Sequence, residues 1–350
     1  MSDRPELRTP TAEQLLLNAC SDIEAQRVLS SSLGRAQAAA AVAVAHPESQ
    51  VICHFLDQYQ ASEARQFQEG VASNLEFICS ADYPAGEFDL FMLPVTRGGE
   101  AELTRDLLQT GYDRLRPGGW LCTAVDNWKD TWLHHEVEKL GKGLVRRPKP
   151  RGIVYRLQKR ERLKRRRDLS CEFVFRDGPN LVQAFSRPGV FSHRQLDLGA
   201  RALLEGMQVA PGMQILEIGC GSGVVSLAAA LREADVQITA IDSNARAVEC
   251  TRQGAVLNNL TDRVAARLDA DGSTVAPAAY DLVVGNPPYF SQYKIADIFL
   301  HTARKALRRG GQVAMVTKRP EWFEARMQQL FKGEPQIVEH RGYFIVSTTR

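Results

Sequence analysis

The sequence predicts an α/β protein of two tandem Rossmann-like domains, of which the N-terminal one is degenerate. Strand-like apolar runs alternate with helix-like amphipathic runs along the C-terminal half. A phrase of that half recurs in the N-terminal half. The chain has 350 residues, which is more than one typical domain needs and enough for two domains that each bury a core.

The C-terminal half has the clearer pattern. We expect strands over 213–218, 236–241, 280–284 and 312–317, and helices over 224–232, 245–260 and 295–307. Strands separated by helices of this length are typical of βαβ units in a mainly parallel, doubly wound sheet. The final run, 336–346, is typical of two strands turned at Arg341 and Gly342, which would add an antiparallel edge.

An internal repeat links the two halves. Glu87–Leu93 (EFDLFML) resembles Ala279–Gly285 (AYDLVVG), and a double glycine follows each segment (RPGG and RRGG). The first of these glycines lies 29 positions after Asp89 in one half and 29 positions after Asp281 in the other. This spacing indicates that one α/β domain was duplicated.

The N-terminal copy differs at the positions where a catalytic site would lie. Before its second strand it has only Gly34 amid alanines, where the other copy has three spaced glycines. It has LPVT at 93–96, where the other copy has GNPP at 285–288. We therefore expect a domain that kept its fold, lost its site, and binds substrate or supports its partner. The expected organisation is a degenerate domain over 1–157, a basic linker over 158–180 and a catalytic domain over 181–350.

A glycine motif, Glu217-Ile-Gly219-Cys-Gly221-Ser-Gly223, stands between an expected strand and an expected helix. Glycines at such a turn let the backbone approach a cofactor, because no Cβ intervenes and positive φ is accessible. A dinucleotide-binding fingerprint would need glycine at position 224, where Val224 stands. By itself this motif is equally compatible with a structural turn.

An acid at the end of the next strand strengthens the cofactor interpretation. Asp242 lies 19 positions after Gly223. A carboxylate at this place can accept hydrogen bonds from both hydroxyls of a ribose. The alternative is that Asp242 or Ser243 caps the following helix.

A third motif, Asn286-Pro287-Pro288-Tyr289, follows the strand expected over 280–284. An amino group on an aromatic ring or a carbonyl is a poor nucleophile, because its lone pair is delocalised. The Asn286 side-chain oxygen and the Pro287 carbonyl can accept the two amino hydrogens and favour tetrahedral geometry at the nitrogen. The prolines stiffen the loop, and Tyr289 can stack on the target. The alternative is that two prolines simply end the strand.

These three motifs, in this order, resemble class I S-adenosylmethionine-dependent methyltransferases that act on amino groups. Pro188-Gly-Val-Phe191-Ser192, followed by LDLG at 196–199, resembles more specifically the bacterial small-subunit ribosomal RNA guanine-N2 methyltransferases. That family pairs a degenerate N-terminal methyltransferase-like domain with an active C-terminal one. The resemblance is strong over 186–350 and only architectural before that.

The resemblance implies a role for each site residue and S-adenosylmethionine as the cofactor. The cofactor-binding set is Glu217, Gly219, Gly221 and Gly223 for the methionine part, Asp242 and Ser243 for the ribose, and Asp269 and Ala270 for the adenine, with Asp271 as the alternative to Asp269. The catalytic set is Asn286, Pro287 and Tyr289, and Phe191 and Pro288 are expected to contact the substrate.

The identity of the target amino group has alternatives. The family usually has Phe and His after the two prolines, where this chain has Tyr289 and Phe290. The same four-residue motif is common in enzymes that methylate adenine N6 or glutamine side chains. Guanine N2 of small-subunit (16S) RNA is the expected target, and guanine N2 of large-subunit RNA is a further alternative. A non-catalytic RNA-binding assembly factor is the rival from another class, against which the intact motif argues.

One short basic segment dominates the charge of the chain. The net charge is +3, but residues 142–167 contain thirteen Lys or Arg and one acid, Glu161. Such a density can neutralise several phosphates, so we expect Lys164, Arg165, Arg166 and Arg167 to bind ribosomal RNA or the small ribosomal subunit. The alternative is a solvated linker.

The composition indicates neither a membrane segment nor a metal. No run approaches the roughly 20 apolar residues of a membrane-spanning helix. The Met1–Leu17 region carries acids and proline instead of the apolar core of a leader, so we expect a cytoplasmic protein. The seven cysteines are dispersed, without a CxxC pair or a partner at metal-ligand spacing.

Overall fold

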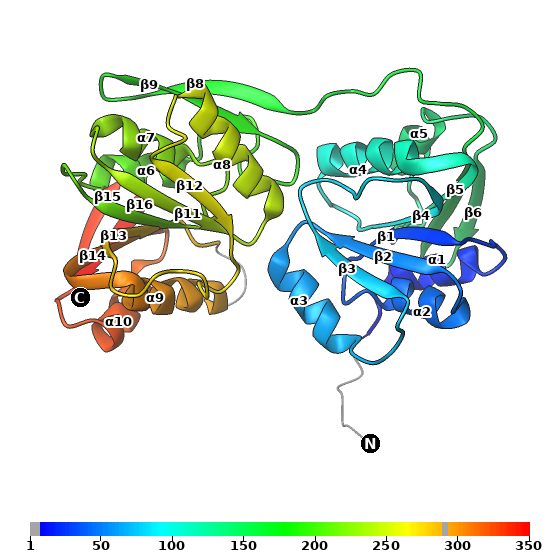
Figure 1. Ribbon diagram of the computed structural model, residues 1–350, viewed down its shortest axis with the longest axis horizontal. Helices are drawn as coiled ribbons and strands as arrows, with labels where there is room; N and C mark the ends of the chain where they lie inside the picture. Colours follow the sequence, from blue (N-terminus) through cyan, green and yellow to red (C-terminus); the bar gives the residue numbers. More distant parts are fainter. Residues whose placement is uncertain (1–7, 289–292) are drawn as a thin grey trace. The chain divides into compact units, whose positions relative to one another are not determined.

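The computed structural model of the protein describes residues 8–288 and 293–350. Its contacts divide the chain into two compact units, Met1–Leu169 and Ser170–Arg350 (Figure 1). Each unit is a three-layer α/β structure with its own core. The predicted fold class is therefore confirmed.

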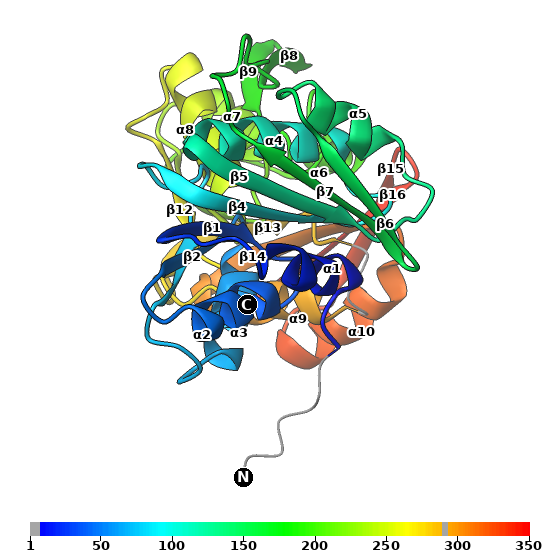
Figure 2. The same cartoon turned by 90° about the vertical axis from the view of Figure 1, so that its right-hand side faces the viewer.

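The N-terminal unit is built on a seven-stranded sheet in the order β3-β2-β1-β4-β5-β7-β6. Strand β7 is antiparallel to both of its neighbours. Helices α1 to α3 cover one apolar core, and α4 and α5 cover the core on the opposite face (Figure 2). Its elements are α1 (Thr11–Cys20), β1 (Arg27–Ser31), α2 (Gln37–Ala45), β2 (Gln50–Phe55), α3 (Gln58–Phe67), β3 (Leu75–Cys79), β4 (Phe88–Val95), α4 (Ala101–Arg114), β5 (Leu115–Val125), α5 (Trp132–Glu138), β6 (Val145–Lys149) and β7 (Gly152–Gln158).

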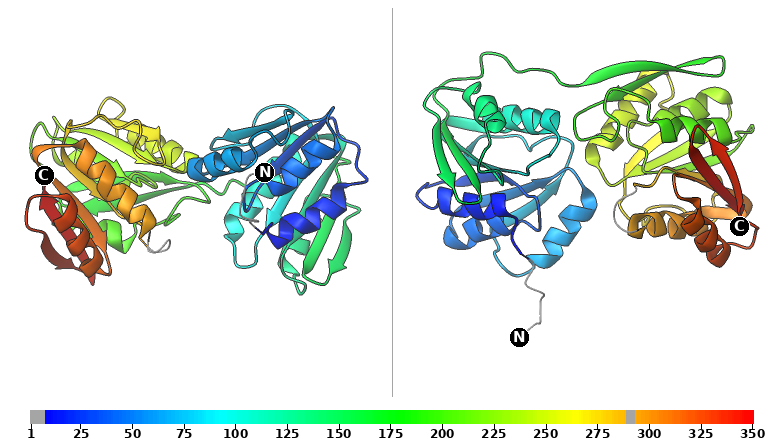
Figure 3. Two further views of the ribbon diagram at one scale, coloured as in Figure 1. Left: turned by 90° about the horizontal axis from the view of Figure 1, so that it is seen from below. Right: turned by 180° about the vertical axis from the view of Figure 1, so that it is seen from behind.

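The C-terminal unit repeats this plan with the order β12-β11-β10-β13-β14-β16-β15. Helices α6 to α8 lie on one face and α9 and α10 on the other. A hairpin, β8–β9, precedes the repeat and packs on α7 and α8 (Figure 3). The elements are β8 (Cys171–Asp177), β9 (Asn180–Ser186), α6 (Leu198–Gly206), β10 (Gln214–Ile218), α7 (Val224–Arg232), β11 (Gln237–Asp242), α8 (Ala245–Leu257), β12 (Val264–Leu268), β13 (Tyr280–Gly285), α9 (Lys294–Ala306), β14 (Leu307–Thr317), α10 (Pro320–Leu330), β15 (Gln336–His340) and β16 (Tyr343–Thr349).

The repeated Asp and double glycine have the same structural task in both units. Asp89 pairs with Arg116, and Asp281 pairs with Arg308. In each unit the carboxylate also accepts a backbone N–H at the start of the first central strand, over 2.8 Å. The first glycine of each pair has positive φ, +84° at Gly118 and +79° at Gly310. The shared phrase therefore encodes one repeated turn, which supports duplication of the domain.

The expected strands and helices of the C-terminal half are present within a few residues of their predicted bounds. The predicted turn at Arg341 and Gly342 joins β15 to β16, and both residues have the positive φ that such a hairpin turn needs. Strand β12, helix α10 and the β8–β9 hairpin were not predicted from the sequence. Strand β12 is short and lies at the sheet edge, where every second side chain is exposed, so its apolar signal is weak.

The irregular chain between β7 and β8 is shorter than the linker expected over 158–180, because Cys171–Asp177 form strand β8. None of the helices in the described ranges is long and apolar enough to cross a membrane. Within residues 8–288 and 293–350, no three His, Cys, Asp or Glu side chains are grouped as metal ligands.

Candidate active site

The motifs of the C-terminal unit converge at one edge of its sheet. Strand β10 lies between β11 and β13, and its last residue, Ile218, pairs with Ile241 and with Gly285. Because these strands are parallel, Asp242 at the end of β11 and Gly219 and Asn286, which directly follow β10 and β13, lie at the same edge. The strand order reverses here, which is where doubly wound folds bind their ligands.

The glycine motif forms a tight loop in which each glycine has positive φ, +74° at Gly219, +54° at Gly221 and +76° at Gly223. A Cβ atom on Gly219 would stand 2.9 Å from the Phe299 ring, and one on Gly223 would stand 2.8 Å from the Thr251 hydroxyl. A Cβ on Gly221 would meet no atom within 4 Å. Packing therefore requires two of the glycines, whereas Gly221 borders open space that a ligand can approach.

Glu217 lies beneath this loop and is 4% exposed. Its Oε2 atom accepts the backbone N–H of Ser226 over 2.9 Å, and also the Ser226 hydroxyl. Burial raises the pKa of Glu217 to about 8, although the Ser226 bonds act in the opposite direction. In this structure Glu217 ties strand β10 to the first turn of α7 and so supports the glycine loop.

Asp242 closes the other side of the loop. Its Oδ2 atom accepts the Gly221 N–H over 2.9 Å, and its Oδ1 atom accepts the Asn244 N–H over 2.8 Å. The cap of helix α8 is Asn244, whose side chain accepts the Arg246 N–H, so the alternative that Asp242 or Ser243 caps this helix was wrong. Asp242 and Ser243 are both partly exposed at the loop.

Asp269 is buried and engaged by its own loop. Its carboxylate accepts the N–H groups of Asp271, Gly272 and Thr274 over 3.2, 2.7 and 2.9 Å, and the Thr274 hydroxyl over 2.5 Å. Burial alone would raise the pKa of Asp269, but these bonds outweigh it and lower the pKa. Ala270 is half-buried and Asp271 is exposed. The carboxylate of Asp271 is therefore more accessible to a ligand than that of Asp269.

Asn286 is half-buried and held by a residue from another element. Its Nδ2 atom donates to Asp197 Oδ2 over 3.0 Å. The same oxygen accepts the N–H groups of Gly199 and Ala200, over 2.8 and 3.1 Å, and thereby caps helix α6. Since the amide nitrogen is committed to Asp197, the amide oxygen is the Asn286 atom that can accept hydrogen from a substrate.

Side chains around Asn286 crowd the position of Gly199. A Cβ on Gly199 would stand 2.8 Å from Asp197 Oδ2, 3.1 Å from Asn286 Nδ2 and 3.2 Å from the Tyr343 ring. The sequence analysis noted the LDLG segment but gave Asp197 no role. An acid directly before a helix is an N-cap signal that could have drawn attention to it.

Of the remaining motif residues, Pro287 is buried and Pro288 is half-buried. Tyr289, which we expected to stack on the target, lies outside the described residues. The motif therefore contributes two described groups at the sheet edge, the Asn286 amide and the Pro287 carbonyl.

Phe191 is 68% exposed on a loop that is fixed from below. Arg246 donates to the Pro188 carbonyl over 2.8 Å, and Asn244 donates to the Gly189 carbonyl over 2.7 Å. Arg246 is fully buried, although it opens the first turn of α8. Nothing in the sequence distinguishes this arginine from a surface one. Phe191 is thus an exposed aromatic ring on an ordered support, which is the arrangement a stacking residue needs.

Comparison with known proteins agrees with this geometry. The family model of the methyltransferase small domain matches residues 182–347, a range that contains Gly219, Asp242 and Asn286. The first half of the chain lies outside that match.

The curated relatives described here carry one name. The chain is 35% identical over 183 residues to "Ribosomal RNA small subunit methyltransferase C" of Pseudomonas entomophila (strain L48), covering 51% of this chain and 54% of the relative. It is 34% identical over 165 residues to the protein of that name from Pseudomonas aeruginosa (strain LESB58), covering 46% of each. The chain thus matches about half the length of these relatives.

One solved structure matches almost the whole chain. It is described as the T. thermophilus 16S rRNA N2 G1207 methyltransferase in complex with AdoMet and guanosine. It covers 97% of this chain and 92% of its own, with a TM-score of 0.80 and 22% identity. This likeness extends the shared fold to both units.

The N-terminal unit lacks the polar side chains that the C-terminal unit has at the matching places. The equivalent strand registers put Ser30 where the C-terminal unit has Glu217. They put buried Phe55 where it has Asp242, and Pro94 where it has Asn286. Each replacement removes a carboxylate or an amide, so this copy of the sheet edge has lost its polar groups.

The loop of the N-terminal unit is instead closed by its own chain. Fully buried Glu13, on α1, accepts the Ser32 hydroxyl and the Leu33 N–H over 2.7 Å each. It also accepts the N–H groups of Gly34 and Ala38, over 3.1 Å each. An internal carboxylate thereby occupies the donors that an anionic or polar ligand would use at this loop.

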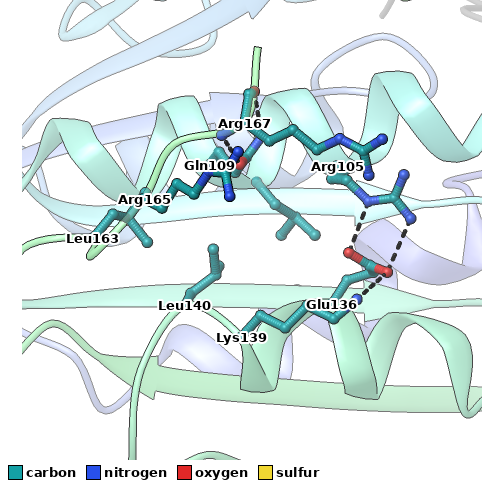
Figure 4. Close-up of a pocket in the computed structure, with 9 residues that line it drawn as sticks. Arg105, Gln109, Glu136, Lys139, Leu140, Leu163, Arg165 and Arg167 are labelled. Carbon is teal, nitrogen blue, oxygen red and sulfur yellow. Dashed lines mark hydrogen bonds and ion pairs between the residues drawn. The ribbon is translucent and has the colours of Figure 1, made fainter. Parts of the chain in front are cut away.

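The basic segment belongs to the N-terminal unit and is not uniform. Buried Arg156 pairs with Asp22, and the buried Lys159 ammonium donates to the Leu115 carbonyl over 2.6 Å. Lys164, Arg165, Arg166 and Arg167 are all exposed. Arg165 and Arg167 line a pocket of this unit (Figure 4).

Proposed function

We propose that this chain transfers a methyl group from S-adenosylmethionine to the exocyclic N2 atom of a guanine in small-subunit (16S) ribosomal RNA. The Asn286–Asp197 hydrogen bond is the observation that carries the proposal, because it leaves a neutral amide oxygen to accept hydrogen from an amino group. The name of the curated relatives supports small-subunit ribosomal RNA as the substrate, and the description of the solved structure supports guanine N2 as the target.

The residues at the sheet edge fit S-adenosylmethionine. Open space at Gly221 and positive φ at all three glycines suit a ligand that lies against the backbone. Asp242 and Ser243, partly exposed beside that loop, would hold the ribose. The adenine would lie near Ala270 and the exposed Asp271. When bound, this cofactor supplies an electrophilic methyl group on a sulfonium sulfur.

The protein groups prepare the nitrogen for attack. The Asn286 oxygen and the Pro287 carbonyl would each accept one amino hydrogen, which favours the tetrahedral geometry that the nitrogen needs. Both acceptors are neutral, and proline holds the second one in place. The nitrogen–carbon bond forms as the carbon–sulfur bond breaks, and the alkylated nitrogen then releases its proton to solvent. No strong base is required, because that proton becomes acidic once the methyl is attached.

The substrate contacts follow from the same edge. Phe191 and Pro288 would contact the target base, and Tyr289 would stack on it. The N-terminal unit would bind ribosomal RNA or the small subunit through Lys164, Arg165, Arg166 and Arg167. A substrate of this kind locates the enzyme in the cytoplasm, without a membrane partner.

The decisive experiment compares nucleosides of ribosomal RNA from cells with and without this protein by mass spectrometry. Loss of N2-methylguanosine from small-subunit RNA supports the proposal. Loss from large-subunit RNA, or loss of N6-methyladenosine, assigns another target. An unchanged profile in both RNAs leaves a protein glutamine or a non-catalytic role.

The Asn286→Ala variant should keep cofactor binding and lose about 100-fold or more in turnover.

A further inference from the structure

The N-terminal unit contains a pocket of about 460 Å³ that the family resemblance does not explain (Figure 4). Helices α4 and α5 form its walls together with the segment that follows strand β7. Four cationic side chains line it: Arg105, Lys139, Arg165 and Arg167. Glu136 is the carboxylate among the lining residues. The charge of the lining is therefore +3.

Glu136 organises two of these cations. Its buried carboxylate accepts Arg105 Nε over 2.9 Å, Arg105 Nη2 over 3.0 Å and Lys139 Nζ over 2.8 Å. The bond from Arg105 lowers the pKa of Glu136, so the acid stays ionised. One carboxylate thus holds two positive charges side by side at the pocket wall, and the net charge there remains positive.

The other two cations are presented by backbone that is fixed to α4. The buried Gln109 side chain accepts the Arg167 N–H over 2.8 Å and donates to the Arg167 carbonyl over 3.3 Å. Leu163 packs against the core beneath α4 and α5. Within the described chain, no hydrogen bond or ion pair engages the guanidinium groups of Arg165 and Arg167. These groups are therefore held near the pocket while their donors remain open to a ligand.

We infer that this pocket binds a phosphate of the RNA backbone, with the attached ribose or base against the partly exposed apolar side chain of Leu163. Guanidinium forks match phosphate oxygens in pairs, and a fixed backbone reduces the entropy lost on binding. The identity of the polymer rests on the proposed function. The pocket would bind one phosphate at a defined position, in addition to the general electrostatic attraction between the basic segment and RNA.

The chain itself offers a matched control. Arg165 and Arg167 line the pocket, whereas Lys164 and Arg166, on the same segment, do not. The double variant Arg165→Ala, Arg167→Ala and the double variant Lys164→Ala, Arg166→Ala each remove two positive charges. Affinity for a fluorescein-labelled RNA hairpin is measured by anisotropy at several salt concentrations, and thermal unfolding checks that each variant is folded.

The pocket pair should weaken RNA binding about tenfold or more and reduce the slope of log affinity against log salt by about 0.7, because one phosphate contact is lost. The control pair should weaken binding clearly less. Equal losses in the two pairs would mean that only overall charge matters and would overturn the proposal. Displacement of the RNA by polyglutamate at equal charge concentration would overturn it as well, in favour of an acidic protein partner.

A charge-neutral variant tests the fixed backbone separately. Gln109→Ala removes both bonds to Arg167 and changes no charge. It should lower RNA affinity several-fold, and unchanged affinity would contradict the role assigned to the two Gln109–Arg167 hydrogen bonds.

Transfer of labelled methyl to unmodified small subunits by the wild-type protein is measured in parallel. Absence of transfer, with pocket-dependent RNA binding intact, would count against the proposed function and leave the pocket standing.

Discussion

Asn286 donates its side-chain amide hydrogen to Asp197, and the same Asp197 oxygen caps helix α6. The two residues are 89 positions apart in the sequence. One carboxylate thus joins the end of strand β13 to the start of α6 and fixes which end of the Asn286 amide is left for a substrate. The acceptor proposed for catalysis is oriented by a residue outside its own motif.

Variants of Asp197 should separate its two roles, the capping of helix α6 and the orientation of the Asn286 amide. Asp197→Ala should lower the stability by about 1 kcal/mol through loss of the cap. It should also lower turnover by about 10- to 100-fold, because the amide of Asn286 becomes free to rotate. Asp197→Ser keeps a capping oxygen but is too short to hold Asn286, so it should restore stability without turnover. Thermal unfolding and methyl-transfer rates measure the two effects, and a Ser variant with normal turnover would contradict the orienting role.

Gly199→Ala tests the close approach at the same place. Alanine is the better helix former by about 1 kcal/mol, so a structural role alone predicts little loss. The added Cβ would stand 3.1 Å from Asn286 Nδ2 and 2.8 Å from Asp197 Oδ2, so one of them must move. We expect a fall in kcat of about tenfold or more with little change in cofactor affinity. The exposed neighbour Leu198→Ala is the control and should retain full kcat.

Glu217 should give the stability of the C-terminal unit a recognisable pH dependence. Its pKa in the folded protein is about 8, above its ordinary value of 4.5. The neutral side chain therefore contributes its full stability below pH 4.5, and this contribution is lost as the pH rises through 8. Glu217→Gln cannot ionise, so its stability relative to wild type should increase by a few kcal/mol between pH 5 and pH 9. The free energy of unfolding of both proteins is measured with urea at several pH values. A difference between them that stays the same across that range would argue against a buried ionising acid.

Phe191 should affect RNA binding more than folding. Because the ring is 68% exposed, Phe191→Ala should leave the unfolding temperature nearly unchanged. Loss of a stacking surface costs about 1 to 3 kcal/mol per base, which corresponds to a rise in KM for RNA of roughly 5- to 150-fold. Phe191→Trp should retain most of the wild-type affinity for RNA, whereas Phe191→Leu should lose affinity as Phe191→Ala does. Steady-state kinetics on unmodified small subunits provide the measurement.

Calorimetric titration should give a stoichiometry of one S-adenosylmethionine per chain. The N-terminal unit has Phe55 and Pro94 at the positions of Asp242 and Asn286 and fills its loop with Glu13. Glu13→Gln places an amide nitrogen among buried N–H donors and should cost about 1 to 3 kcal/mol of stability in that unit. It should not create a second cofactor site. A stoichiometry of two in calorimetry would contradict the idea that this unit is degenerate.

The fold and the three motifs could be predicted because their signals are local or regularly spaced. Alternating runs located the strands of the C-terminal half, and the shared Asp and double glycine revealed the repeat. The strand ends then placed Gly219, Asp242 and Asn286 at one edge. These positions follow from periodicity, which a single sequence carries.

The supporting residues could not be predicted, because their partners come from other elements. Asp197 meets Asn286, Arg246 meets Pro188, and Glu13 meets the loop after β1 only once the helices are packed on the sheet. The split of the basic segment into buried Arg156 and pocket-lining Arg165 likewise depends on three-dimensional neighbours. A count of charges in the sequence treats these arginines alike.

The carboxylate of Glu13 makes the N-terminal loop permanently liganded, by a group that can never diffuse away. Ligand binding stabilises a fold by a free energy that grows with the logarithm of the free ligand concentration, and such linkage acts only on a site that can be empty. With the cofactor proposed here, the supply of methyl donor in the cell would set the stability of one half of the chain and leave the other half insensitive. If the proposed site binds this cofactor, duplication followed by loss of one site would leave a protein in which only the C-terminal unit responds to the supply of methyl donor.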